Sequence, residues 1–322
     1  ATQAYTLDTT NPSITPVTMA SNNAVTTLSK DGNTVTITFT ADATIQTPTC
    51  DVEVPDNTDA TNAESINDGG SNVWTCAVVL DDADDDGAIV FSIVSTDTAG
   101  NSVTTTSTTD GTAVTHDDTV PVISTVAFAS GDYVNAVEDN SAIDLVITMS
   151  DTSANGQVAT ATLNSAGYTC TISSNACTAS ITAAGLQGLT DGTTYTFSVA
   201  ISDAAGNAAT ANTAESFLYD VTAPSISNVV PSWGTHLNAA EDNADGTVTV
   251  TTLNAADAST VTVTGMGVTD TCSTSSNACV ATVAGGDLRA LNDGTTYTIT
   301  VALTADPAGN TATSDTGDTF LY

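Results

Sequence analysis

The sequence has very little positive charge. Lys30 and Arg289 are its only lysine and arginine, against 37 aspartates and glutamates, and its formal net charge is −35. Proteins bind nucleic acid and anionic membranes largely through Lys and Arg, which displace counterions from the phosphates. The composition therefore excludes both as partners. It also indicates salty surroundings or bound divalent cations, because so many carboxylates need screening.

Long apolar runs are absent as well, since no window reaches the roughly 18 to 20 apolar residues that span a bilayer. The only histidines, His116 and His236, lie in different parts of the chain, so a Ser-His-Asp site would need chance convergence. We expect both to be exposed structural residues. The only tryptophans, Trp74 and Trp233, are too far apart in sequence to line a sugar-binding groove. These shortages predict that the protein is not an enzyme.

Two short motifs recur with a period near one hundred residues. The first is a linker that begins with Asp and ends with Pro, and its prolines lie 109 and 103 positions apart. Its copies are residues 8–12, 117–121 and 220–224. The second is a turn of the form Asp-x-Ala-Gly-Asn, and its copies are residues 97–101, 203–207 and 306–310. A period of this length matches one β-sandwich domain and is too long for a solenoid repeat.

Between these motifs, β-branched and aromatic residues alternate with polar ones. Tyr195, Phe197, Val199 and Ile201 follow this pattern, which predicts a strand with one buried face. We expect an all-β chain of three tandem immunoglobulin-like β-sandwiches in an elongated array. The expected domains are residues 8–116, 117–219 and 220–322, preceded by residues 1–7 as the last strand of another module.

The ends of the second and third repeats carry a family resemblance. Leu-Thr-Asp-Gly-Thr-Thr-Tyr195 and Leu-Asn-Asp-Gly-Thr-Thr-Tyr297 each lead into an alternating strand and then the Asp-x-Ala-Gly-Asn turn. This arrangement resembles the bacterial Ig-like domains strung along large extracellular surface adhesins and biofilm-associated proteins. The two tyrosines stand where a tyrosine corner would lie in such a sandwich. The first repeat departs from the pattern, because it has no tyrosine after Gly87.

Six cysteines fall as one pair in each repeat. The pairs are Cys50 with Cys76, Cys170 with Cys177, and Cys272 with Cys279. We expect a disulfide in each pair, which places the protein outside the cytoplasm. Reduced buried thiols or a zinc site remain alternatives, although two thiols without nearby histidines supply too few zinc ligands. The first pair encloses an acidic insertion, residues 51–75, which we expect to be a long functional or mobile loop.

Carboxylates and amides are expected to converge where successive modules meet, because sandwich topology brings linkers, turns and loops to the ends of each domain. Such clusters can supply the oxygen ligands that calcium prefers. The candidate ligands are Asp8, Asp97, Asn101, Asp117, Asp118, Glu138, Asp139, Asp203, Asn207, Asp220, Glu241, Asp242, Asp306 and Asn310. Asp86 and Asp191 are expected at the same junctions. The alternative is a solvated acidic surface with ordinary tight turns.

Three functions fit this sequence. The first is a stiff, calcium-braced stalk or fibre of an extracellular cell-surface adhesin, in a high-salt or marine setting, and we favour an excised stretch of a longer protein. The second is a filament subunit that exchanges its N-terminal strand, residues 1–7, with a neighbour. The third is a module whose acidic insertion binds a cell-surface receptor or glycan. The expected partners are neighbouring Ig-like modules or subunits of the same fibre.

Overall fold

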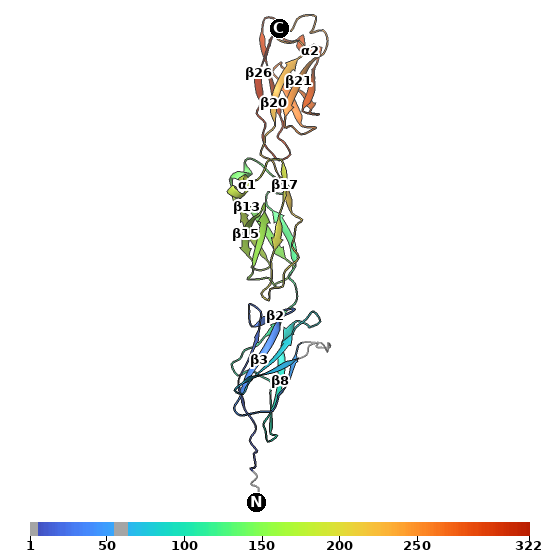
Figure 1. Cartoon of the computed structure of the whole chain (residues 1–322). Helices are drawn as coiled ribbons and strands as arrows, with labels where there is room; N and C mark the ends of the chain where they lie inside the picture. Colours follow the sequence, from blue (N-terminus) through green and yellow to red (C-terminus); the bar gives the residue numbers. More distant parts are fainter. Residues whose placement is uncertain (1–5, 55–63) are drawn as a thin grey trace, which may run out of the picture.

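A computed structural model of the chain describes residues 6–54 and 64–322. These residues form three β-sandwiches placed end to end, with the N- and C-termini at opposite ends of an elongated molecule (Figure 1). Each sandwich has its own hydrophobic core, and no core cluster contains residues from two sandwiches. Separate cores are the mark of separate domains. We call the sandwiches modules 1, 2 and 3 in chain order.

Module 1 pairs β1, β3, β6 and β5 in one sheet, and β4, β8 and β9 in the facing sheet. A small third group, β2, β10 and β7, closes the end nearer module 2 (Figure 1). The strands are β1 (Ile14–Ser21), β2 (Leu28–Ser29), β3 (Thr34–Ala41), β4 (Thr49–Glu53), β5 (Ser65–Gly70), β6 (Val73–Val79), β7 (Gly87–Ala88), β8 (Val90–Thr96), β9 (Ser102–Thr105) and β10 (Thr115–His116).

Module 2 pairs β11, β13 and β16 in one sheet, while β15, β14 and β18 together with β12, β19 and β17 form the other layer. A short helix α1 lies at its upper end in Figure 1, and a 3-10 turn η1 contacts this helix. The elements are β11 (Ile123–Phe128), β12 (Tyr133–Val134), η1 (Glu138–Asn140), β13 (Ile143–Met149), β14 (Val158–Leu163), β15 (Ala166–Thr171), β16 (Ala176–Ile181), α1 (Ala183–Gln187), β17 (Thr193–Thr196), β18 (Ser198–Ala200) and β19 (Ser216–Tyr219).

Module 3 repeats this plan, with β20, β21 and β24 facing β23, β22, β25 and β26. Its last strand β26 pairs along β25, so its sandwich is closed by residues of the same module. The elements are β20 (Ser225–Pro231), β21 (Gly246–Leu253), β22 (Thr260–Thr264), β23 (Asp270–Ser273), β24 (Ala278–Val283), α2 (Gly285–Leu288), β25 (Thr296–Leu303) and β26 (Asp315–Leu321).

The predicted alternation places side chains as expected. Phe197, Val199 and Ile201 are buried in module 2, and the aromatic rings of Phe128 and Phe217 lie 5.0 and 5.7 Å from that of Phe197. Burying these apolar faces stabilises the sandwich by about 25 cal/mol per Å² removed from water. The strand is interrupted at Phe197, where pairing passes from β19 to β14.

The two tyrosines that the sequence singled out occupy a tyrosine-corner arrangement. The Tyr195 hydroxyl accepts a hydrogen bond from the Thr190 amide at 2.8 Å, and the Tyr297 hydroxyl accepts one from the Asn292 amide at 2.8 Å. Each bond holds the loop five residues upstream against the strand that follows it. This bond satisfies a loop N–H group that would otherwise need water.

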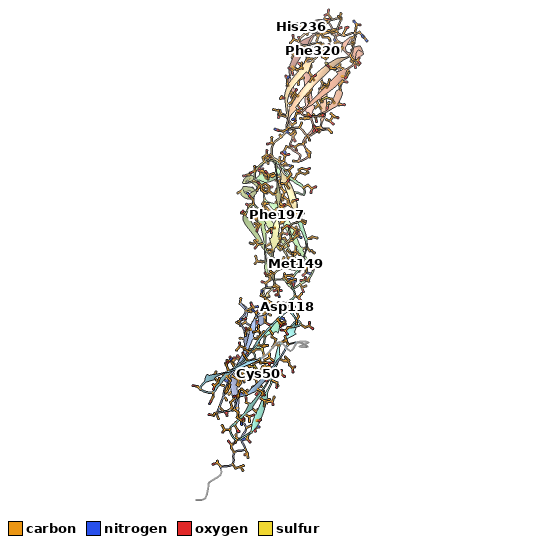
Figure 2. All side chains as sticks on the ribbon, turned by 45° about the vertical axis from the view of Figure 1, so that its right-hand side comes forward. Cys50, Asp118, Met149, Phe197, His236 and Phe320 are labelled. Carbon is orange, nitrogen blue, oxygen red and sulfur yellow. A yellow bond between two sulfur atoms is a disulfide. The ribbon has the colours of Figure 1, made fainter. Side chains whose placement is uncertain are left out.

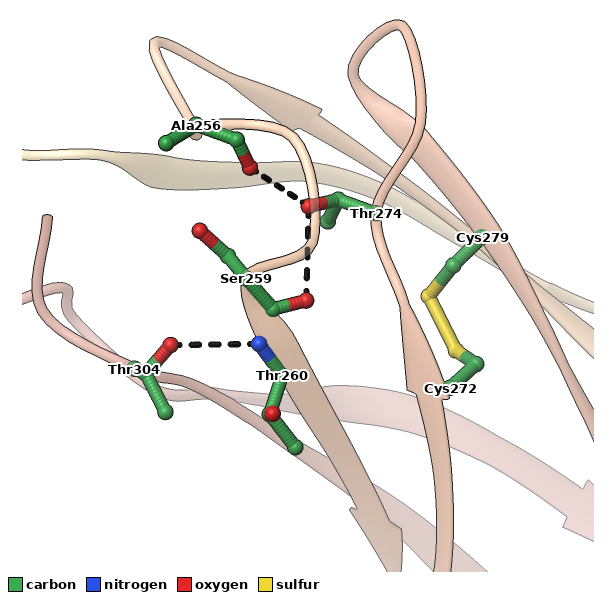
Figure 3. Close-up of a disulfide and its surroundings, with 7 residues drawn as sticks. All are labelled: Ala256, Ser259, Thr260, Cys272, Thr274, Cys279 and Thr304. Atoms are coloured by element: carbon green, nitrogen blue, oxygen red, sulfur yellow. Dashed lines mark hydrogen bonds between the residues drawn. A yellow bond between two sulfur atoms is a disulfide. The ribbon is translucent and has the colours of Figure 1, made fainter.

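All three cysteine pairs are disulfide-bonded in the structure. In modules 2 and 3 the bond joins the two layers across the turn between adjacent strands, as Figure 3 shows for Cys272 and Cys279. Thr274 lies between these cysteines, and its hydroxyl donates to the carbonyl of Ala256 at 2.6 Å. In module 1 the two cysteines do not lie on consecutive strands, because Cys50 lies on β4 and Cys76 lies on β6. Its bond therefore closes a much longer segment.

Parts of two sequence expectations are wrong. Residues 51–75 are not one loop: residues 51–53 belong to β4, residues 65–70 form β5 at the edge of a sheet, and β6 begins at residue 73. A second correction concerns His116, which is buried rather than exposed. It lies on strand β10, which pairs with β2 and β7, and its Nδ1 lies 3.5 Å from the hydroxyl oxygen of Ser29, which is also buried.

Two predicted features lie partly outside the described residues. These parts are residues 55–63 of the acidic insertion and residues 1–5 of the N-terminal segment. Residues 6 and 7 belong to no strand. Among the residues that the structure describes, no helix is long and apolar enough to cross a membrane.

Candidate functional site at the module junctions

The Asp-x-Ala-Gly-Asn turn is built around the aspartate carboxylate. In module 2, Asp203 Oδ1 accepts from the amides of Gly206 at 2.7 Å and Asn207 at 2.8 Å, and Oδ2 accepts from Asn207 Nδ2 at 2.9 Å. Gly206 has a φ of +91°, which glycine adopts without strain. Asp97 makes the same three bonds in module 1, and Asp306 makes the two from Asn310 in module 3. The carboxylate oxygens of the turn aspartates therefore accept hydrogen bonds from within the turn itself.

The asparagine that ends each turn also holds the linker. Asn207 Nδ2 donates to the carbonyl oxygen of Asp117 at 2.7 Å, and Asn310 Nδ2 donates to that of Asp220 at 2.8 Å. Asn101 Nδ2 donates to the Asp8 carbonyl at 3.3 Å. The structure thus brings together the linker and turn residues that the sequence predicted to meet, although they are about ninety positions apart.

A second carboxylate, from the preceding module, holds the linkers at residues 117–121 and 220–224. Asp86 accepts from the amide of Asp118 at 2.7 Å and from the hydroxyl of Thr119. Asp191 accepts from the amide of Val221 at 2.8 Å and from the hydroxyl of Thr222. The Thr222 hydroxyl and the Val221 amide lower the pKa of Asp191, because both bonds favour its charged form.

Direct contacts cross both junctions. At the first, Asn23 Nδ2 donates to the carbonyl of Ala205 at 2.8 Å, and Lys30 Nζ donates to that of Gly206 at 2.7 Å. At the second, Asn135 Nδ2 donates to the carbonyl of Ala308 at 2.8 Å, and the Ala136 amide donates to Asn310 Oδ1 at 3.1 Å. In each case a loop of the preceding module receives the turn of the following one. We call residues 23–33, 135–139 and 238–242 the receiving loops.

Glu138 and Asp139, both proposed as calcium ligands, shape the receiving loop of module 2. Glu138 Oε2 accepts from the Asn135 amide at 3.1 Å, and the buried Asp139 accepts from the Tyr219 hydroxyl at 2.8 Å. Burial and the Asp139 bond raise the pKa of Tyr219 to about 12. Asp242 accepts from the Tyr322 hydroxyl at 2.7 Å in module 3. Asp139 and Asp242 therefore hold their loops to the tyrosines that end modules 2 and 3.

The first aspartate of each linker between modules has a raised pKa. Burial, followed by the nearby carboxylates of Asp203 and Asp86, raises the pKa of Asp117. Burial, followed by Asp306, raises the pKa of Asp220. Both shifts disfavour the ionised forms, chiefly through burial and in smaller part through the neighbouring negative charges. A counter-charge at either linker would relieve this repulsion.

The candidate ligands do not all meet. Glu241 and Asp242 lie in the receiving loop of module 3, away from both junctions. Asp8, Asp97 and Asn101 lie together near the start of module 1. Within residues 6–54 and 64–322, no group of three or more His, Cys, Asp or Glu side chains is placed to hold a metal ion.

Three residues that make the direct contacts were missed from the sequence: Asn23, Lys30 and Asn135. The sequence did contain a signal for Asn135, because the segment Asn135-Ala-x-Glu-Asp139 recurs as Asn238-Ala-x-Glu-Asp242. Only the acidic residues of this repeat were taken as functional, since calcium chemistry favours carboxylates. The asparagine makes the contact between modules.

No protein-family model matches the chain, and no curated protein matches it by sequence. Among solved structures, one concerning host cell surface retention of a 1.5-MDa bacterial ice-binding adhesin is 23% identical, covers 96% of this chain and 98% of its own, and has a TM-score of 0.42. A Ca2+-stabilized adhesin with which an Antarctic bacterium reaches out and binds ice is 24% identical, with coverages of 96% and 74% and a TM-score of 0.45.

The I-band fragment I67–I69 of titin is 9% identical, with coverages of 91% and 94% and a TM-score of 0.47. These likenesses concern the fold. Within the chain itself, the sheet pairing repeats from module to module, the cores are separate and the linkers recur. The described chain is a tandem array of three immunoglobulin-like β-sandwich modules.

Proposed function

We propose that this chain is a stiff spacer of an extracellular cell-surface adhesin, which holds a binding part away from the cell. One observation carries the proposal: the same hydrogen-bonded interlock occurs at both junctions. In each, a receiving-loop asparagine donates to the carbonyl of the turn alanine, and the turn asparagine donates to the linker carbonyl. A tether with two anchoring points resists bending, whereas a free linker would let domains move independently.

The disulfides and the surface charge support an extracellular setting. Disulfides persist in oxidising compartments, and all three pairs are bonded. A net charge of −35 keeps such chains soluble and apart from one another. The linker and turn motifs, which resemble those of bacterial surface adhesins, agree with this role.

Substitution of Asn135 tests the interlock. Asn135→Ala removes the donor to the Ala308 carbonyl, and it should loosen the second junction while leaving the core of module 2 intact. We expect small-angle X-ray scattering to show a shorter maximum dimension and a broader particle distribution than for the unchanged chain. Asp132→Ala, an exposed position in the same module, is the matched control. An N135A chain as extended as the control would contradict the proposal.

Calcium at the junctions is a further part of the proposal. The donor chemistry suits it, because the carboxylates of Asp117 and Asp220 lie near other carboxylates that raise their pKa. A bound divalent cation would supply positive charge there. Since the described residues hold no group of three ligating side chains, backbone and water oxygens would complete the shell.

Thermal unfolding with and without calcium tests this part. We expect calcium to raise the midpoint, because a ligand at a hundred times its Kd stabilises the folded state by about 2.7 kcal/mol. Sodium chloride at matched ionic strength should raise it less, since it only screens. Asp220→Asn should reduce the calcium effect. Equal unfolding midpoints in calcium and in EGTA would contradict calcium binding at the junctions. The hydrogen-bonded interlock would then be the only proposed source of stiffness.

A further inference from the structure

Modules 2 and 3 differ at a pair of positions that face each other in module 2. Tyr168 and Asp270 both lie two residues before the first cysteine of their disulfide, and they hold the same place in the pairing of β14 with β15 and of β22 with β23. In module 2 the Tyr168 hydroxyl lies so close to Gly185, on α1, that a Cβ there would collide with it. The residue equivalent to Gly185 is Asp287, on α2. A tyrosine over a glycine in module 2 thus corresponds to two aspartates in module 3.

The exchange accompanies a pocket in module 3. It has a volume of about 260 Å³, lies between the β22–β23 hairpin and α2, and is lined by Met266, Gly267, Val268, Asp287, Leu291 and Tyr297. Leu189 of module 2 is 8% exposed, whereas Leu291, at the equivalent place, is only half-buried. The volume is just below that of sites for drug-sized molecules, so it suits a ligand of a few heavy atoms.

Most of the pocket wall is apolar and held in place. Met266, Val268 and Leu291 present aliphatic or thioether groups, and Tyr297 presents its ring. That ring stacks on Phe320 with 5.6 Å between centroids, and Figure 2 places Phe320 in the half of module 3 that lies farther from module 2. The Tyr297 hydroxyl is already held by the Asn292 amide. The wall is therefore preformed, which lowers the cost of ordering it around a ligand.

The polar groups of this region are carboxylates without a matching cation. Asp287 lines the pocket, and the Oδ2 atom of Asp270 is buried with no hydrogen-bond partner among the described residues. Burial, followed by the charge of Asp287, raises the pKa of Asp270. The only arginine of the chain, Arg289, follows Asp287 by two positions, but its Nη1 donates to the Asp242 carbonyl at 3.2 Å. A buried acceptor oxygen without a donor is costly, and a cationic donor would relieve this cost.

The pocket lies in a part of the module that the interlock does not use. In module 2, residues 164–167 of the corresponding hairpin are exposed although module 3 follows. Among the described residues, the direct hydrogen bonds from the body of module 2 to module 3 come from Asn135 and Ala136, in the receiving loop. The hairpin side of a module therefore stays accessible beside an engaged junction.

We propose that the pocket between α2 and the β22–β23 hairpin of module 3 binds a primary alkylammonium group, either the end of a lysine side chain of another protein or a free amine. The ammonium group pairs with Asp287 and supplies the donor that Asp270 Oδ2 lacks. Its methylenes contact Met266 and Val268, as lysine stems do on apolar surfaces. The Tyr297 ring adds attraction for a cation within about 6 Å of its centre. This activity is separate from the spacer function.

Amide NMR spectra of the full chain test the proposal. The chain is titrated at neutral pH with n-butylammonium chloride, with Nα-acetyl-lysine methylamide, and with sodium chloride at matched ionic strength. Asp287→Asn removes one charge and keeps the shape, and Asp270→Tyr/Asp287→Gly gives module 3 the pair found in module 2. Asp293→Asn, at an exposed position of the same module, is the matched control.

We expect n-butylammonium to cause saturable shifts at the amides of Gly267, Val268 and Asp287 that sodium does not cause. Binding should weaken by about tenfold in D287N, because a charge-assisted contact is lost. It should disappear in the double variant and stay unchanged in D293N. If the spectrum of the double variant shows that module 3 is unfolded, the comparison of D287N with D293N decides.

The lysine derivative identifies the source of the amine. Equal shifts with it support a lysine side chain of a partner protein, and shifts with n-butylammonium alone support a free amine. Shifts spread over the acidic surface, or equal affinities in D287N and D293N, would overturn the proposal. So would calcium chloride that shifts these amides when n-butylammonium does not, because the site would then be one for a metal ion.

Discussion

Replacing Asp203 with alanine is expected to destabilise module 2 by about 3 kcal/mol and to loosen the first junction. The buried carboxylate accepts hydrogen bonds from Gly206 and from both nitrogens of Asn207. Bonds to a charged acceptor contribute about 1.5–3 kcal/mol each, and water entering the gap recovers part of the loss. Freed from Asp203, Asn207 would hold the Asp117 carbonyl less firmly.

Hydrogen exchange followed by mass spectrometry measures this effect module by module. We expect peptides of module 2 to exchange roughly a hundredfold faster, which corresponds to about 3 kcal/mol. Asp203→Asn retains one acceptor oxygen for the backbone amides and should lose about half as much. Asp132→Ala, an exposed position in the same module, should change little. Equal exchange in D203A and D132A would show that the turn carboxylate does not hold the turn.

Removing the disulfide of module 1 is expected to lower its free energy of unfolding by about 3.5 kcal/mol. Cys50 and Cys76 are 26 positions apart, and cross-linking a loop of this length limits the entropy of the unfolded chain by about that amount. The variant Cys50→Ser/Cys76→Ser removes the cross-link with little change in side-chain volume. Hydrogen exchange followed by mass spectrometry reports on this module separately from the others.

Module 2 supplies the matched comparison. Cys170 and Cys177 are only 7 positions apart, so Cys170→Ser/Cys177→Ser should cost about 2.5 kcal/mol on the same reasoning. The loop-length explanation therefore requires the module 1 variant to lose more than the module 2 variant. The reverse order would mean that packing around the sulfurs, rather than unfolded-state entropy, sets the size of the effect.

The sequence predicts the repeat architecture because short-range patterns determine it. Alternation marks the buried faces of strands such as β13, and the recurring linker and turn give the period. The meeting of Asn207 with Asp117 also follows, since sandwich topology brings turn and linker to one end of the domain. The disulfide pairs of modules 2 and 3 follow from the equivalent residues that flank Cys177 and Cys279.

Other features depend on contacts that no local pattern records. The burial of His116 is one of them, because it lies on the two-residue strand β10, and two residues of strand carry too little periodicity to predict a buried face. Strand β5 is mostly polar because it forms a sheet edge, so its composition resembles a loop. The turn carboxylates were expected to bind calcium, yet Asp203 and Asp306 accept hydrogen bonds from their own turns.

The receiving asparagines show a further limit. A single neutral side chain such as Asn135 has no charge pattern, and its value comes from the carbonyl that a neighbouring module places 2.8 Å away. At the first junction Asn23 performs the same task from a loop with a different sequence, assisted by Lys30. Equivalent function without equivalent sequence arises because a backbone carbonyl can be recognised by any well-placed donor.

Residual dipolar couplings of the unchanged chain in a weakly aligning medium test the central claim most directly, because they report whether neighbouring modules tumble together. The interlock predicts one common alignment tensor for modules 1, 2 and 3, with equal magnitude in each. Separate tensors of clearly different magnitude for the three modules would show that the junctions are flexible and would contradict the account of this chain as a stiff spacer.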